Sequence, residues 1–159
     1  MAKVLVVDDE ASIREFLEIL LRRLGHKVTL AKDVVEAIAK LGGADFDVVL
    51  SDLRLPKGSG MDVLRHVVAG ESGAQVIIVT AFATTENAIE AMKIGAYDYV
   101  IKPFKVDELT LLVQRALEKR QLQVENTQLR VDLGVRKAQD RILGRSGALQ
   151  GVFEIIRKV

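Results

Sequence analysis

Short apolar runs recur five times along the chain, and four of them end at or beside a polar residue suited to phosphate chemistry. The runs are residues 4–7, 28–30, 48–50, 76–79 and 99–101. Asp8 and Asp9 follow the first run, and Asp52 closely follows the third. Thr80 follows the fourth and Lys102 the fifth. Because ligands of open parallel sheets bind outside the carboxyl ends of the strands, these groups are expected to converge at one rim.

Helical patterns separate the apolar runs. Apolar residues recur at helical spacing within residues 13–24, 37–41, 61–68 and 88–94, and Gly25 and Gly95 provide stops after the first and last of these. Alternation of strands with helices predicts an α/β fold, in which a five-stranded parallel sheet carries helices on both faces. Gly58-Ser59-Gly60 is expected to form a turn before the third helix.

Composition excludes several classes of protein. The 159 residues, 49% of them hydrophobic, suffice for one domain plus an appendage. The chain has no cysteine, which excludes disulfides and thiolate zinc sites. No leader pattern opens the sequence, and no apolar run approaches the roughly 18 residues of a membrane span. We therefore expect a cytoplasmic protein with no membrane contact.

Charge differs between the two parts of the chain. Residues 1–104 hold 12 Lys and Arg against 15 Asp and Glu, whereas residues 105–159 hold 11 against 7. The basic residues of the second part are interspersed with acids, and no aromatic residue falls between Phe104 and Phe153. This pattern favours a solvated helix face over a nucleic-acid surface.

Residues 106–133 contain neither proline nor glycine and predict a fifth, unusually long helix, which Gly134 could end or bend. Two apolar stripes along it disagree in register, and Asn126 stands four residues after the start of the second: Leu117, Val124, Val131 and Ala138 form the first, and Leu122, Leu129 and Leu133 the second. The candidate dimer residues are Leu117, Val124, Asn126, Leu129 and Val131. An asparagine at a core position can set the register of a two-stranded coiled coil, so we expect a dimer helix. The alternative is a long amphipathic helix that packs on its own domain.

The polar groups at the predicted rim suit phosphoryl transfer. Asp8, Asp9 and Asp52 would repel one another unless a cation joined them, and hard oxygen ligands without His or Cys suit Mg²⁺. A carboxylate can then act as the nucleophile, while Lys102 contacts phosphoryl oxygens and Thr80 donates a hydrogen bond. Taken singly, each residue could instead have an ordinary structural role: an acid in a helix N-terminal turn, a loop acid, a helix cap or a surface lysine.

Four motifs resemble the receiver domain of bacterial two-component response regulators: VLVVDDE, DVVLSDLRLPKGSGMDVL, VIIVTAF and GAYDYVIKPF. The resemblance covers about residues 1–120 and implies a flavodoxin-like sheet of order 2-1-3-4-5. It implies that a sensor histidine kinase phosphorylates Asp52 with Mg²⁺, which Asp8, Asp9, Asp52 and the Arg54 backbone carbonyl would bind. Lys102 would be the phosphate lysine, Thr80 the switch hydroxyl and Tyr99 the switch aromatic. Pro103 would belong to the switch as well, because the Lys102–Pro103 bond is usually cis in the family, which would aim Lys102 at the site.

The segment RILGRSGALQGVFEIIRKV resembles the opening of the AAA+ ATPase domain of NtrC-type sigma-54-dependent transcriptional activators. The expected organisation is a receiver at 1–120, a linker helix at 121–140 and an ATPase stub at 141–159. No phosphate-loop motif occurs in the chain. We therefore expect a homodimeric phosphoacceptor rather than an enzyme, with self-phosphorylation from small donors and slow self-dephosphorylation. In a full-length protein, sigma-54 RNA polymerase and DNA would be partners of other domains.

A second class of function is an aspartate-nucleophile phosphatase on a similar fold. Such an enzyme usually places D-x-D after the first strand, whereas this chain has Asp8-Asp9-Glu10 there and its expected acceptor after the third. A nucleotide-binding domain is disfavoured, because Gly58-Ser59-Gly60 lacks the third glycine of a dinucleotide fingerprint.

Overall fold

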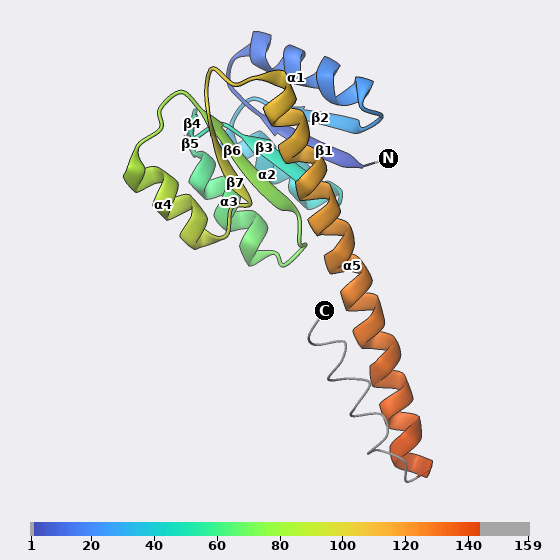
Figure 1. Ribbon diagram of the computed structural model, residues 1–159. Helices are drawn as coiled ribbons and strands as arrows, with labels where there is room; N and C mark the ends of the chain where they lie inside the picture. The colour runs from blue at the N-terminus through green and yellow to red at the C-terminus, as the bar shows by residue number, and fades with distance from the viewer. Residues whose placement is uncertain (1, 144–159) are drawn as a thin grey trace. The chain divides into compact units, whose positions relative to one another are not determined.

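Strands and helices alternate along the part of the chain that the computed structural model describes, residues 2–143, with side chains through residue 126 (Figure 1). The elements are β1 (Lys3–Val7), α1 (Ala11–Arg23), β2 (Lys27–Ala31), α2 (Val34–Gly43), β3 (Val48–Ser51), β4 (Arg54–Leu55), β5 (Gly58–Ser59), α3 (Gly60–Ala69), β6 (Gln75–Thr80), α4 (Thr85–Ile94), β7 (Asp98–Ile101) and α5 (Val106–Leu143). The expected ATPase stub lies almost entirely outside the described residues.

Five strands form one sheet in the order β2-β1-β3-β6-β7, and every neighbouring pair is parallel. The predicted sheet and its order are therefore confirmed. A separate antiparallel pair, β4 and β5, joins Arg54 to Ser59 where only a turn was expected. Strands of two residues are too short to show an alternating pattern in the sequence, so this small hairpin had no periodic signal.

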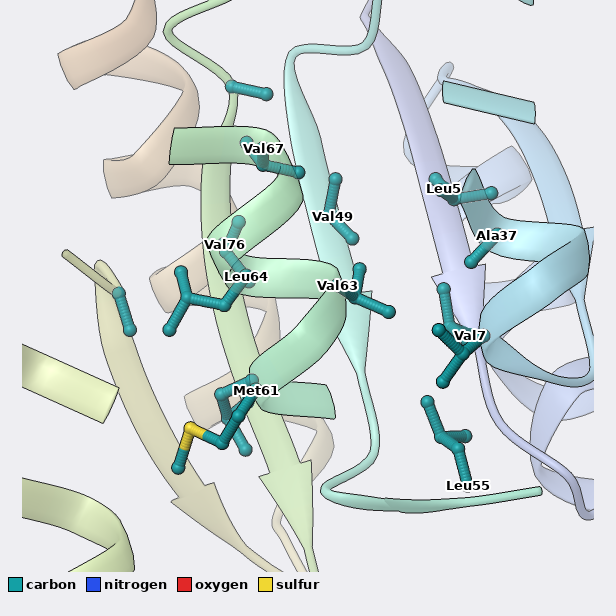
Figure 2. Close-up of a cluster of buried hydrophobic side chains, with 14 of the residues drawn as sticks. Leu5, Val7, Ala37, Val49, Leu55, Met61, Val63, Leu64, Val67 and Val76 are labelled. Atoms are coloured by element: carbon teal, nitrogen blue, oxygen red, sulfur yellow. The ribbon is translucent and has the colours of Figure 1, made fainter. Parts of the chain in front are cut away.

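Helices bury both faces of the sheet. On one face, α2, α3 and α4 pack over Leu5, Val7, Val49 and Val76; Figure 2 shows the side chains of this cluster. On the other face, α1 and residues 106–120 of α5 pack over the alternate strand residues. A strand covered on both sides has no need of polar alternation, which explains the unbroken apolar run of β1.

Three of the helices begin at a side-chain cap that satisfies free backbone N–H groups. Asp33 accepts from the Glu36 N–H at the start of α2, and Thr84 accepts from the Asn87 N–H at the start of α4. Ser59 and Asp62 form a reciprocal capping box at the start of α3. Helix α1 differs, because the side chain of its N-cap residue Glu10 makes no capping hydrogen bond.

Helix α5 runs for 38 residues and continues through Gly134, which therefore does not end it. A first compact unit comprises Met1–Arg120, and the remainder of α5 belongs to a second unit that begins at Gln121. Within the described residues, no helix has an apolar stretch of the length and hydropathy that a membrane crossing requires.

Candidate functional site

The strand register brings residues from opposite ends of the first unit together at the carboxyl rim of the sheet. Val7 lies opposite Ser51 in neighbouring strands, so Asp8 and Asp52, the next residues, leave the sheet side by side. Lys102 follows the edge strand β7, and its side chain reaches both acids. Its Nζ donates to Asp8 Oδ2 at 2.8 Å and to Asp52 Oδ2 at 2.9 Å.

Three carboxylates cluster at this rim, as the sequence predicts. Asp8, Asp9 and Asp52 each offer one oxygen, and these oxygens lie within 4.8 Å of one another. Asp8 and Asp52 are buried, whereas Asp9 is exposed. A set of hard, anionic oxygen donors without nitrogen or sulfur, open on the Asp9 side to water, fits Mg²⁺.

The Asp8 carboxylate is held on both oxygens. Oδ1 accepts from the Glu10 backbone N–H at 2.9 Å, and Oδ2 accepts from Lys102. Burial raises the pKa of Asp8, and the hydrogen bonds from Lys102 and the Glu10 backbone oppose that rise. An additional bond was not predicted: Arg14 Nη1 donates to the Asp8 backbone carbonyl at 2.6 Å.

Lys102 is the cation that balances the buried acids. Its side chain is only 12% exposed, and burial alone would lower the pKa of its ammonium group. Hydrogen bonds to Asp8 and Asp52 outweigh burial and raise the pKa above its ordinary value. Lys102 is therefore charged at neutral pH. The Lys102–Pro103 bond is cis, in agreement with the expectation from the family resemblance.

Asp52 is fixed mainly through its backbone. Its N–H donates to the Val7 carbonyl at 2.9 Å, and its carbonyl accepts from the Ser51 hydroxyl at 3.0 Å. Oδ1 accepts from the Arg54 backbone N–H at 3.3 Å. Gly60, the first residue of α3, lies so close that a Cβ there would stand 2.2 Å from the Asp52 carbonyl oxygen. The predicted role of the Arg54 carbonyl as a metal ligand stays a prediction.

The two expected switch residues lie on neighbouring strands. Thr80 ends β6, is fully buried, and its Oγ1 accepts from the Phe82 backbone N–H at 3.1 Å. Tyr99, on β7, is half-buried and packs against the cluster beneath α2, α3 and α4. Its hydroxyl is buried without a hydrogen bond of good geometry among the described residues. Burial raises the pKa of Tyr99, and the nearby Thr84 backbone opposes part of that rise.

Sequence reasoning passed over Asp33 and Arg14 near the same rim. Asp33 follows β2, caps α2 and lies 3.6 Å from the Lys57 ammonium, so it ties α2 to the β4–β5 turn. An Asp directly before a helical pattern is a standard capping signal. The signal for Arg14 was weaker. A cation early in a helix is unfavourable to the helix dipole, so its presence there suggests a specific contact.

The candidate dimer residues fall on α5 in two groups. Leu117 is half-buried against the cluster beneath α1 and α5, so it contributes to the core of its own unit. Val124 is 49% exposed and Asn126 is half-buried. The side chains of Leu129 and Val131 lie outside the described residues.

Comparison with known proteins agrees with this geometry. Residues 4–114 match the response regulator receiver domain family. Regulatory protein AtoC of Escherichia coli K12 is 35% identical over 157 residues, covering 99% of this chain and 34% of that protein. The chain thus spans about a third of the length of this curated relative.

Solved structures show the same fold. A response regulator receiver domain protein from Clostridium thermocellum superposes with a TM-score of 0.70 at 36% identity, over 77% of this chain and 98% of that one. The beryllofluoride-activated NtrC4 receiver domain dimer gives 0.72 at 33% identity, over 76% and 99%.

Proposed function

This chain belongs to the family of response regulator receiver domains, and we propose that it accepts a phosphoryl group on Asp52 from a sensor histidine kinase. The observation that carries the proposal is the position of Lys102 Nζ, within 2.9 Å of both Asp8 and Asp52. An ammonium group between two buried acids, 94 and 50 residues away in sequence, is an arrangement that holds anionic oxygens.

In the proposed step, a carboxylate oxygen of Asp52 attacks the phosphorus of a phosphohistidine. A new P–O bond forms as the P–N bond breaks, and the electron pair returns to the imidazole nitrogen. Mg²⁺, when bound by Asp8, Asp9 and Asp52, supplies positive charge that offsets the approach of an anionic donor to anionic ligands. Lys102 exchanges its hydrogen bond to Asp52 for one to a phosphoryl oxygen.

The response to phosphorylation is proposed to pass through Thr80 and Tyr99. The Thr80 hydroxyl, which now accepts from the Phe82 N–H, would turn to donate to a phosphoryl oxygen. The buried hydroxyl of Tyr99 has the Thr84 backbone near it but makes no hydrogen bond of good geometry within the described part of the chain, so movement of its ring breaks no strong bond. Both residues border α4, and their displacement would remodel the surface of α4, β7 and α5.

We further propose that residues 1–120 are the receiver, 121–140 a linker helix that holds a homodimer, and 141–159 the start of an AAA+ domain. The match to AtoC extends over 157 residues and therefore beyond the receiver, which supports this organisation. On this view, phosphorylation controls a cytoplasmic sigma-54-dependent activator. Sigma-54 RNA polymerase and DNA would contact its other domains.

Labelling with acetyl phosphate tests the proposed acceptor. The chain should acquire an acid-labile, hydroxylamine-sensitive label with Mg²⁺ and none with EDTA. Asp52→Asn, which keeps the size of the side chain, should abolish the label. The matched control is Asp45→Asn, an exposed acid in the loop after α2, which should label normally. A label that persists in Asp52→Asn assigns the acceptor elsewhere.

A further inference from the structure

Arg14 stands at the fourth position of α1, where its charge does not favour the helix. The positive end of the helix dipole is at the N-terminus, and cations there are unfavourable. Helix α1 has no acidic residue in its first turn and no side-chain cap, unlike α2, α3 and α4. The helix dipole therefore offers no reason for an arginine at this position.

The contact that Arg14 makes is with the β1–α1 turn. Its half-buried guanidinium donates through Nη1 to the Asp8 carbonyl at 2.6 Å, a short, charge-assisted hydrogen bond. That carbonyl belongs to the peptide group that joins Asp8 to Asp9. The bond thus fixes the peptide plane immediately before Asp9, and the Glu10 N–H, bonded to Asp8 Oδ1, fixes the next one.

Asp9 depends on its backbone for its direction. Its side chain is exposed, and among residues 2–126 its carboxylate makes no hydrogen bond or ion pair, whereas Asp8 is held on both oxygens. Outer contacts that orient a metal ligand commonly change metal affinity by about 10–100-fold. The peptide that Arg14 holds is one of the two that set the direction of the Asp9 side chain.

We propose that Arg14 is a positioning residue for the divalent cation of this site, acting through the Asp8–Asp9 peptide on the Asp9 carboxylate. The inference rests on the proposed Mg²⁺ site. It predicts a change in affinity for the cation that is opposite in sign to the change that charge alone predicts. Removing a nearby positive charge should strengthen binding of a cation, whereas loss of positioning should weaken it.

Calorimetric titration of the full chain with MgCl₂, without any phosphoryl donor, measures this directly. Arg14→Gln should raise the Kd for Mg²⁺ about tenfold. Arg14→Lys keeps the charge and can reach the carbonyl with one donor, so it should bind Mg²⁺ more tightly than Arg14→Gln but less tightly than the wild type. The matched control is Arg23→Gln, an exposed arginine at the far end of α1, which should leave the Kd unchanged.

A Kd that stays the same or falls in Arg14→Gln overturns the positioning role. If that variant does not fold, Arg14→Met takes its place, because it removes the donor but keeps a long unbranched side chain, and a Kd that stays the same or falls there also overturns the role. Asp9→Ala separates this inference from the proposed function. If Asp9→Ala binds Mg²⁺ as tightly as the wild type does, the metal site itself is wrongly placed. A variant that only loses stability lowers the unfolding midpoint without moving the Kd.

Discussion

The guanidinium carbon of Arg54 lies 3.9 Å from the centre of the Phe82 ring. Arg54 begins the short strand β4, Phe82 lies in the loop between β6 and α4, and each stands two positions beyond a site residue, Asp52 or Thr80. Phe82 is 47% exposed, so this cation–π contact is worth about 0.5–1 kcal/mol. Because Arg54 and Phe82 each follow a site residue so closely, we expect the two side chains together to form a partial cover next to the acceptor.

Removing this cover should shorten the life of the aspartyl phosphate. We expect Phe82→Ala and Arg54→Ala each to reduce the half-life about two- to fivefold, because each leaves its partner without the contact and admits water. The double variant should lose little more than either single one, since both break the same contact. Decay of the labelled protein in Mg²⁺ buffer measures all three.

Phe16→Ala is the control for this experiment. Phe16, on α1, is 43% exposed and packs near Phe104, so its loss removes a similar exposed ring without touching the Arg54–Phe82 contact. Its aspartyl phosphate should decay at the wild-type rate. Unchanged half-lives in both Arg54→Ala and Phe82→Ala would show that neither residue controls access of water.

Lys102→Met should destabilise the fold at neutral pH by about 1–3 kcal/mol, because it leaves two buried carboxylates without their shared cation. In the wild type the raised pKa of Lys102 stabilises the fold at all pH values below 10.5, and this contribution is lost as pH rises through the higher folded pKa. In the variant, Asp8 loses the hydrogen bond and charge that restrain the rise of its pKa.

An acid with a raised pKa binds protons more readily in the folded state, so acidification toward that pKa stabilises the fold. Lys102→Met should therefore recover stability relative to the wild type as pH falls from 7 to 5. Urea denaturation in EDTA at both pH values checks this, and Lys105→Met, an exposed lysine nearby, should show neither effect. A loss that is the same at both pH values would contradict the proposed coupling.

The sequence predicted the sheet and most of the site because both follow from simple rules. Apolar runs marked the strands, and the convergence of parallel strand ends placed Asp8 beside Lys102 despite their separation in sequence. The contact of Arg14 with the Asp8 carbonyl was not predicted, because the reach of a long side chain to a backbone carbonyl does not affect the periodicity of the sequence. The β4–β5 hairpin was not predicted, because strands of two residues are too short to show alternating hydrophobicity. The close approach of Gly60 to Asp52 depends on how the start of α3 packs against the loop after β3, which no sequence pattern encodes.

Gly60→Ala should weaken both folding and phosphorylation. Its Cβ would stand 2.2 Å from the Asp52 carbonyl oxygen and 3.1 Å from the Leu53 Cα, and backbone atoms cannot rotate away. We expect a loss of about 1–3 kcal/mol in the free energy of unfolding, and slower labelling by acetyl phosphate in the protein that remains folded. Gly42→Ala, in α2, is the control, because a Cβ there meets nothing within 4 Å. It should be neutral or stabilise by up to about 1 kcal/mol.

The linker part of α5 should hold the unphosphorylated chain as a dimer. Leu122 is 60% exposed and Val124 49%, and a second copy of the helix is the partner that the seven-residue spacings from Leu122 to Leu129 and from Val124 to Val131 indicate. Truncation after residue 120 keeps the compact unit Met1–Arg120 and removes these side chains. We expect it to weaken dimerisation at least about tenfold, which corresponds to about 1.4 kcal/mol. Sedimentation velocity across a concentration series measures the change.

Two single substitutions refine this prediction. Leu122→Ser should weaken the dimer, whereas Leu111→Ser, an equally apolar position of α5 that is 46% exposed within the first unit, should not.

The chain has no cysteine, so Leu122→Cys introduces a unique crosslinking site. Oxidation should join two unphosphorylated chains through this position, and beryllofluoride with Mg²⁺ should slow the crosslink if phosphorylation loosens the linker. A truncated chain that dimerises as tightly as the full one would remove the linker from the interface. A crosslinking rate that beryllofluoride does not change would show that the linker does not respond to phosphorylation.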